Sequence, residues 1–211
     1  MKLFITGIST DVGKTIASSI IVEALEADYW KPIQAGDLDN SDSHKIRNNI
    51  SNNKTIIHEN SYKLNTPASP HLAAERDGIT IDLKQIKEPN PDGYREKNHL
   101  VIEGAGGLLV PLNDTYCIVD LIKADYKVIV VSKHYLGSIN HTLLTIEALK
   151  SRKIKIAGII FSGDKNESTE TIILNKTGVT FIGRIEQEPY FDQTVVREYA
   201  DLFRENLLKL Q

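Results

Sequence analysis

The sequence predicts an α/β protein with three layers and a mostly parallel central sheet. Short apolar runs, typical of strands buried on both faces, alternate with segments of helical periodicity along most of the chain. A glycine-rich turn joins the first of these strands directly to the first helix. Regular alternation of strand and helix favours a parallel sheet covered by helices on both faces. Because no repeat or linker interrupts it, we expect a single domain over residues 1–211.

Composition limits the kinds of partner. Of the 211 residues, 41% are hydrophobic and 25% charged, as in soluble globular proteins, and the net charge of -3 favours neither nucleic acid nor an anionic membrane. The single cysteine, Cys117, has no partner for an internal disulfide. Because no cleavable leader and no run of membrane-spanning length is evident, we expect a cytoplasmic protein without nucleic-acid or membrane partners.

The chain begins with a strand at about residues 2–6 and a helix at about 14–27, joined by Gly-Ile-Ser-Thr-Asp-Val-Gly-Lys-Thr. In such a loop, backbone N–H groups and the positive end of the helix converge on one point, which suits a phosphate. Lys14 adds a cation for the outer phosphates, and the Thr15 hydroxyl is suited to ligate Mg²⁺. Five residues separate Gly7 from Gly13, where the usual phosphate-binding loop has four. The loop is therefore a variant; the alternative is an ordinary turn with an exposed lysine.

The next part of the chain predicts a short strand at about residues 29–33. Pro32 lacks an N–H and biases the preceding residue to extended geometry, so Lys31 lies at the carboxyl end of this strand. Ligands bind at that edge of open parallel sheets. Residues 34–98 are polar and irregular, and we expect short surface helices there, one of them beginning at Ser69 or Pro70.

A third strand is predicted at residues 99–107, with its apolar part ending in Glu103 and glycines following. A carboxylate at a strand tip resembles the acidic metal position of phosphate-loop enzymes. The alternative is an acidic residue that caps a turn. The remaining elements alternate as strand 127–132, helix 136–151, strand 156–161, helix 167–176, strand 179–182 and helix 193–208.

The candidate site collects two lysines, Lys14 and Lys31, the Thr15 hydroxyl, and two carboxylates, Asp42 and Glu103, at one sheet edge. This set suits transfer of a γ-phosphoryl group, because Mg²⁺ bridges phosphate oxygens while the ammonium groups neutralise developing charge. Asp42 is the weaker candidate, since an acidic residue in a polar loop is usually solvated.

Several motifs in order along the chain resemble the dethiobiotin synthetase family. They are the variant loop 7–15, Lys31-Pro32-Ile33-Gln34, Asn40-Ser41-Asp42, Ser69-Pro70-His71, Glu103-Gly104-Ala105-Gly106-Gly107 and Gly137-Ser138-Ile139-Asn140-His141. The resemblance implies ATP- and Mg²⁺-dependent closure of a ureido ring on 7,8-diaminononanoate with CO₂, giving dethiobiotin, ADP and phosphate. The implied route runs through a carbamate and a carbamic-phosphoric anhydride.

The same resemblance implies roles for individual residues. Thr10, Lys14 and Lys31 would act on the carbamate and the reacting phosphate. The nucleotide and its metal would be bound by Asp11, Val12, Gly13, Lys14, Thr15, Ile16, Asp42, Glu103, Gly104, Ala105 and Gly106, with Thr15, Asp42 and Glu103 as metal ligands. The substrate would be bound by Thr10, Lys31, Ala35, Gly137, Ser138, Ile139 and Asn140. In the family, the helix starting at Gly137 comes from the neighbouring subunit, so the resemblance implies a homodimer with shared active sites.

The chain departs from the family pattern at three places. Ala35 replaces a serine or threonine, so only backbone contacts remain there. Ser162-Gly163-Asp164 replaces an asparagine that reads adenine in some relatives, which leaves the choice of nucleotide open. Helix 167–176 contains no tyrosine for the substrate carboxylate.

Two other functions use similar loops. A nucleotide-dependent switch of the partitioning or cell-division type usually has an extra lysine where this chain has Ile8 and Ser9, and often ends in a basic amphipathic helix, whereas helix 193–208 is mixed in charge. Ligases of the cobyrinic acid type carry an added glutaminase domain, for which 211 residues are too few.

Overall fold

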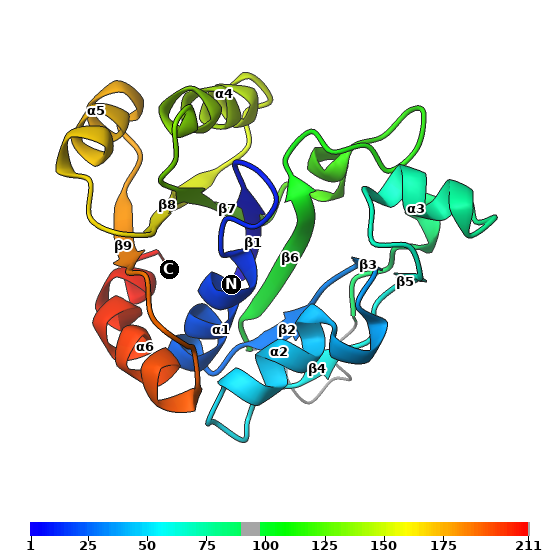
Figure 1. Ribbon diagram of the computed structural model, residues 1–211, viewed down its shortest axis with the longest axis horizontal. Helices are drawn as coiled ribbons and strands as arrows, with labels where there is room; N and C mark the ends of the chain where they lie inside the picture. The colour runs from blue at the N-terminus through cyan, green and yellow to red at the C-terminus, as the bar shows by residue number, and fades with distance from the viewer. Residues whose placement is uncertain (90–97, 211) are drawn as a thin grey trace.

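The main sheet of the computed structural model, which describes residues 1–89 and 98–210, has the strand order β4-β2-β6-β1-β7-β8-β9. Every neighbouring pair in it is parallel, and β1 lies between β6 and β7 (Figure 1). The strands are β1 (Lys2–Gly7), β2 (Asp28–Trp30), β4 (Ile57–His58), β6 (Leu100–Gly107), β7 (Tyr126–Lys133), β8 (Ile156–Ser162) and β9 (Phe181–Ile185). The predicted α/β fold is confirmed.

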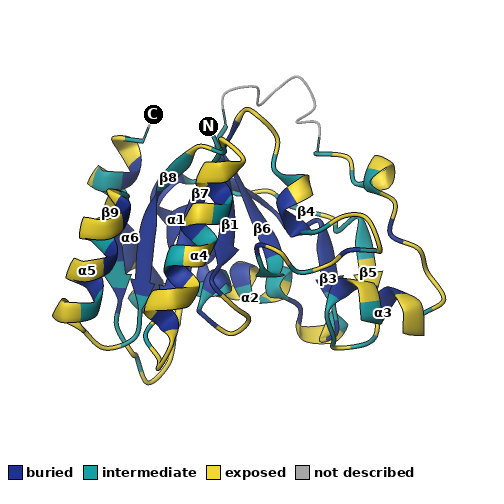
Figure 2. Ribbon diagram, turned by 90° about the horizontal axis from the view of Figure 1, so that it is seen from above, coloured by how far each residue is buried: buried dark blue, intermediate teal, exposed yellow. Residues whose placement is uncertain are grey.

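Helices cover both faces of this sheet. On one face, α1 (Lys14–Leu25) packs against α6 (Gln193–Leu208); on the other, α4 (Ser138–Ser151) packs against α5 (Glu167–Thr177) (Figure 1). The strands between these layers are almost wholly buried, while the outer faces of α4 and α5 are exposed (Figure 2). Burial on both faces explains the near-continuous apolar runs of the strands.

Residues 33–86 form a smaller region beside β2. It contains a two-stranded parallel sheet of β3 (Ile33–Ala35) and β5 (Tyr62–Leu64), with helices α2 (Asp42–Asn49) and α3 (Pro70–Arg76). The two helices agree with the prediction, and α3 begins at Pro70, whose missing N–H costs nothing in the first turn. The three strands of this region, β3, β4 and β5, were not predicted, because two or three residues are too few for a periodic pattern. One-turn helices lie at Leu38–Asn40, Leu83–Gln85 and Ile118–Leu121.

Several boundaries shift by one to three residues, as in β9, which was predicted at 179–182, and two differences from the predictions concern the candidate site. The predicted strand at 29–33 is divided, because β2 ends at Trp30 and β3 begins in the other sheet at Ile33. Lys31 nevertheless directly follows β2, as expected. The prediction that Glu103 lies at a strand tip is wrong, because β6 continues through the glycines to Gly107 and Glu103 lies in its middle. Glycine lacks a side chain but retains its N–H and C=O, so the ladder continues past the carboxylate.

Among residues 1–89 and 98–210, no helix combines the length and the apolar character needed to cross a bilayer.

Candidate active site

The loop between β1 and α1 is tightly folded. A Cβ atom added to Gly7 would lie 2.5 Å from Val12 Cγ2 and 2.8 Å from the Ser9 carbonyl oxygen, so no larger residue fits there. Gly13 has a φ of 92°, in the left-handed region that glycine adopts without strain. The folding of the loop therefore requires glycine at both positions.

Lys14, the first residue of α1, folds back over this loop. Its Nζ donates to the Ser9 carbonyl oxygen at 3.1 Å, and the residue is only 7% exposed. Burial lowers the pKa of Lys14; the charge of Glu103 acts against this, and that of Lys31 acts with it. Two ammonium groups thus influence each other here.

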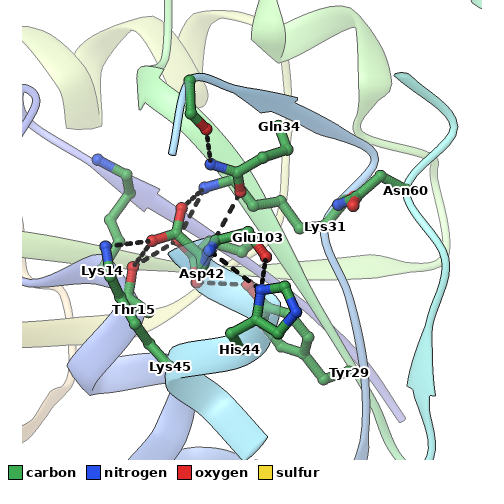
Figure 3. A network of polar contacts seen from close by, with 12 residues as sticks. Lys14, Thr15, Tyr29, Lys31, Gln34, Asp42, His44, Lys45, Asn60 and Glu103 are labelled. Atoms are coloured by element: carbon green, nitrogen blue, oxygen red, sulfur yellow. Dashed lines mark hydrogen bonds and ion pairs between the residues drawn. The ribbon is translucent and has the colours of Figure 1, made fainter. Parts of the chain in front are cut away.

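Three oxygen-bearing side chains from different elements meet beside Lys14 (Figure 3). Thr15 Oγ1, in the first turn of α1, is 3.1 Å from Asp42 Oδ1 and 3.0 Å from Glu103 Oε1. Asp42 is the first residue of α2, and Glu103 lies on β6 and is 1% exposed. The structure therefore brings the three predicted metal ligands together.

Lys31 lies between the two carboxylates. Its Nζ is 2.5 Å from Asp42 Oδ2 and 3.1 Å from Glu103 Oε1, and its side chain is 6% exposed (Figure 3). Burial alone would lower the pKa of Lys31, but the charges of Glu103 and Asp42 raise it overall. Burial alone would likewise raise the pKa of Asp42, but Lys31 holds it below its ordinary value. Lys31 is therefore a buried ammonium at neutral pH.

A cavity of about 1040 Å³ opens above this cluster. Of the predicted site residues it is lined by Thr10, Asp11, Gly13, Lys14, Thr15, Ile16, Lys31, Ala35, Asp42, Glu103, Ala105 and Gly106. Val12 and Gly104 do not line it: Val12 is 1% exposed, and Gly104 packs against Phe4 and Ile118. Gly137, Ser138, Ile139 and Asn140, at the start of α4, do not line it either.

Other lining residues were not predicted as site residues. They include Gln34, whose Oε1 accepts a 3.4 Å hydrogen bond from the Asp42 N–H, and Phe191, which precedes α6. Tyr29 was also missed; its hydroxyl donates to Glu103 Oε2 at 3.0 Å. Burial, followed by the charge of Glu103, raises the pKa of Tyr29 well above its ordinary value. Tyr29 lies two residues before Lys31, but no motif in the sequence marks it as a site residue.

The donor set suits a hard divalent cation. One hydroxyl and two carboxylates present oxygen atoms only, and all three lie within hydrogen-bonding distance of one another or of the same ammonium. The part of the chain that the structure describes contains no group of three or more His, Cys, Asp or Glu side chains that could hold a metal ion by themselves. Mg²⁺ is typically held by one or two carboxylates together with phosphates and water, so these residues fit it.

A parallel sheet whose central strand leads through this loop into a helix, with a lysine and a hydroxyl at the helix start, defines a P-loop nucleotide-binding protein. Residues 1–195 match the family described as AAA domain. A Christiangramia forsetii protein named ATP-dependent dethiobiotin synthetase BioD is 58% identical over 207 residues, 98% of each chain. A Cytophaga hutchinsonii protein of the same name is 50% identical over 200 residues, 94% of this chain and 95% of the other. The chain belongs to the dethiobiotin synthetase family of ligases, so it is an enzyme.

Solved structures of low sequence identity share the fold. The Pyrococcus furiosus cell division ATPase MinD superimposes with a TM-score of 0.56 at 10% identity, covering 100% of this chain and 99% of its own. A plasmid partition protein from Borrelia burgdorferi bound to AMPPNP gives a TM-score of 0.54 at 13% identity, covering 99% and 97%. At such identities the likeness concerns the fold alone, so it does not support the alternative of a partitioning or cell-division switch.

Proposed function

We propose that the chain closes a ureido ring on 7,8-diaminononanoate with CO₂ and ATP, giving dethiobiotin, ADP and phosphate. The observation that carries this proposal is the convergence of Lys14 and Lys31 on one cavity beside Thr15, Asp42 and Glu103. Both reactants at the chemical step, a carbamate and a triphosphate, are anions. Two ammonium groups offset the repulsion between them and the charge that builds up during phosphoryl transfer.

The reaction consists of three bond-forming steps. A substrate amine attacks CO₂ and loses a proton, which gives a carbamate. A carbamate oxygen then attacks the γ-phosphorus, and ADP leaves. The second amine attacks the carbamate carbon and loses its proton, phosphate leaves, and the ring closes. In this scheme Thr10 and Lys31 hold the carbamate, and Lys14 contacts the reacting phosphate. Ala35 offers the substrate its backbone.

Thr15, Asp42 and Glu103 are the residues that would hold Mg²⁺. The bound ion supplies Lewis-acid stabilisation of the phosphate oxygens. Lys31 Nζ contacts both of these carboxylates, so its ammonium lies beside the position that the cation would take. The backbone N–H groups of residues 11–16, those of Val12 and Gly13 among them, would bind the phosphates. Ala105 and Gly106 on β6 line the cavity and would border the nucleotide, whereas Gly104 packs against Phe4 and Ile118.

We further propose a homodimer in which α4 completes the partner's active site. The backbone N–H groups of residues 137–140 suit a carboxylate, which is the group at the tail of the substrate. These residues do not line the chain's own cavity, which supports action on another subunit. The surface there is apolar and exposed, with Leu136 at 104% and Leu144 at 56%. We also propose that the enzyme is soluble and cytoplasmic and that its partners are small-molecule substrates.

The proposal is tested with diaminononanoate, bicarbonate, Mg²⁺ and ATP, and with mass detection of the cyclic urea. We expect product formation that depends on all four components. Light scattering after gel filtration tests the dimer, and a stable dimer without nucleotide is expected. Dimerisation only on nucleotide binding, together with ATP hydrolysis in the absence of diamine, would instead indicate a switch.

A further inference from the structure

The second strand contributes a buried hydroxyl to the site. Tyr29 is 0% exposed, and its hydroxyl donates to Glu103 Oε2 at 3.0 Å. The other oxygen of the same carboxylate, Oε1, is bound by Thr15 Oγ1 at 3.0 Å and by Lys31 Nζ at 3.1 Å. The two oxygens of Glu103 therefore have separate partners, as Figure 3 shows.

Strand register explains how Tyr29 reaches this carboxylate. In the β2–β6 ladder, Tyr29 pairs with Val101 and Trp30 with Ile102. Glu103 is two residues beyond Val101, so it shares a face of the sheet with Tyr29, while Trp30 points to the opposite face. A long aromatic side chain spans this diagonal distance between neighbouring strands. The contact is thus built into two strands of the main sheet, which are rigid elements.

We propose that Tyr29 is a positioning residue for the metal: by holding Oε2, it leaves Oε1 as the oxygen that Glu103 presents to the cation. This inference rests on the proposed role of Glu103 as a metal ligand. A free carboxylate rotates about its terminal torsion, whereas a carboxylate with one oxygen bound to a fixed hydroxyl does not. Outer partners of metal ligands typically contribute 10- to 100-fold to metal affinity.

A matched control exists elsewhere in the chain. Tyr126 is 1% exposed and its hydroxyl donates to Glu88 Oε2 at 2.7 Å, so it too is a buried tyrosine bound to a carboxylate. It pairs with Lys2, the first residue of β1, whereas the phosphate loop follows the last residue of that strand. Tyr126→Phe therefore removes the same kind of hydrogen bond at the opposite end of the sheet.

The test measures Mn²⁺ binding by electron paramagnetic resonance on the full chain saturated with AMPPNP, and AMPPNP binding in EDTA. We expect Tyr29→Phe to weaken Mn²⁺ binding about tenfold or more while AMPPNP binding in EDTA is unchanged. Tyr126→Phe should alter neither. Thermal unfolding of both variants measures how much stability each lost hydrogen bond contributes. When Glu103→Gln is already present, Tyr29→Phe should cause no further loss of Mn²⁺ affinity.

Two results would overturn the inference: wild-type Mn²⁺ affinity in Tyr29→Phe, or equal weakening by Tyr29→Phe and Tyr126→Phe. Its failure is distinct from failure of the proposed function. A wild-type chain that forms the cyclic urea while Tyr29→Phe binds Mn²⁺ normally refutes only the role of Tyr29. A chain that forms no product but loses Mn²⁺ affinity with Tyr29→Phe refutes only the proposed reaction.

Discussion

Replacement of Lys31 by methionine tests whether its ammonium serves the chemistry as well as the fold. The change keeps most of the aliphatic stem and removes the charge between Asp42 and Glu103, from which Nζ is 2.5 and 3.1 Å away. Removing one partner of a fully buried ion pair costs about 3–5 kcal/mol. Because the Asp42 side chain is 18% exposed and borders the cavity, water reduces this, and we expect a loss of about 2 kcal/mol in the free energy of unfolding.

The effect on turnover should be larger than the effect on stability. Loss of one group that stabilises charge in the transition state typically lowers kcat about 10²- to 10³-fold. Nucleotide affinity should stay within about a few-fold of wild type, because Lys31 is assigned to the carbamate and the reacting phosphate and most nucleotide contacts are left intact. Product is measured by mass detection, nucleotide binding by calorimetry and stability by urea unfolding in metal-free buffer. Mg²⁺ with AMPPNP should restore part of the lost stability, since it returns positive charge to the two carboxylates.

Lys45→Met is the control for this experiment. Lys45 Nζ is 3.7 Å from Asp42 Oδ1, and its side chain is 40% exposed where it borders the same cavity, so it is a more solvated cation near the same carboxylate. We expect less than about 1 kcal/mol of destabilisation and near-normal turnover. The reasoning is refuted if Lys31→Met forms the cyclic urea at a near-normal rate, or if both lysine variants lose the same activity.

Four further predictions use other parts of the chain. Phosphate release from ATP, followed by a coupled assay, should be slow until both diamine and bicarbonate are present; rapid release without diamine would contradict the proposed reaction. With ATP, CTP and GTP compared in the product assay, we expect product from more than one nucleotide, because Ser162 lacks the amide that reads adenine in some relatives; strict use of ATP would contradict this. Gly183→Ala should lower the free energy of unfolding by about 1–3 kcal/mol in urea, because the added Cβ would lie 2.2 Å from the Phe203 ring. In the control Gly178→Ala the Cβ meets no atom within 4 Å, so only the strain of a φ of 63° destabilises the fold. Burial alone would raise the pKa of Glu170, but hydrogen bonds from Arg184 and His134 lower it below its ordinary 4.5. The stability that Glu170 provides should therefore be present above pH 4.5 and decline as the pH falls below that value. If Glu170→Gln shows the same dependence of urea unfolding on pH between 5 and 3 as the wild type, this prediction is refuted.

The main elements could be predicted because their signals are local. Residues 128–131 are apolar because both faces of β7 are covered, and the loop at residues 7–15 is recognisable from its own glycine, lysine and threonine residues. The position of Glu103 in the middle of β6, instead of at its tip, could not be predicted in this way. Strand β6 continues past it because β1 offers hydrogen-bond partners as far as Gly107, and that partner is remote in sequence.

Some site residues could be predicted because their position in a motif indicates their role. This holds for Lys14, Thr15 and Glu103. Lys31 was inferred from Pro32, but its contacts with both carboxylates depend on Asp42, which reaches the cluster only because α2 begins there. Tyr29 has no motif. Its contact with Glu103 depends on the register of β2 against β6, which a single sequence does not specify.

The ammonium, hydroxyl and carboxylate groups described around the proposed cation all lie before residue 108, on β2 and directly after it, on β6 and in the first turns of α1 and α2. The later half of the chain approaches the cavity through Phe191 and stands beside Gly13 through Ser162. The polar groups assigned to the cation thus come from one stretch of the chain, whereas Ser162 lies beside the phosphate loop without belonging to them. Substitutions at Ser162 are therefore the place to begin testing whether the enzyme can be adapted to other nucleoside triphosphates.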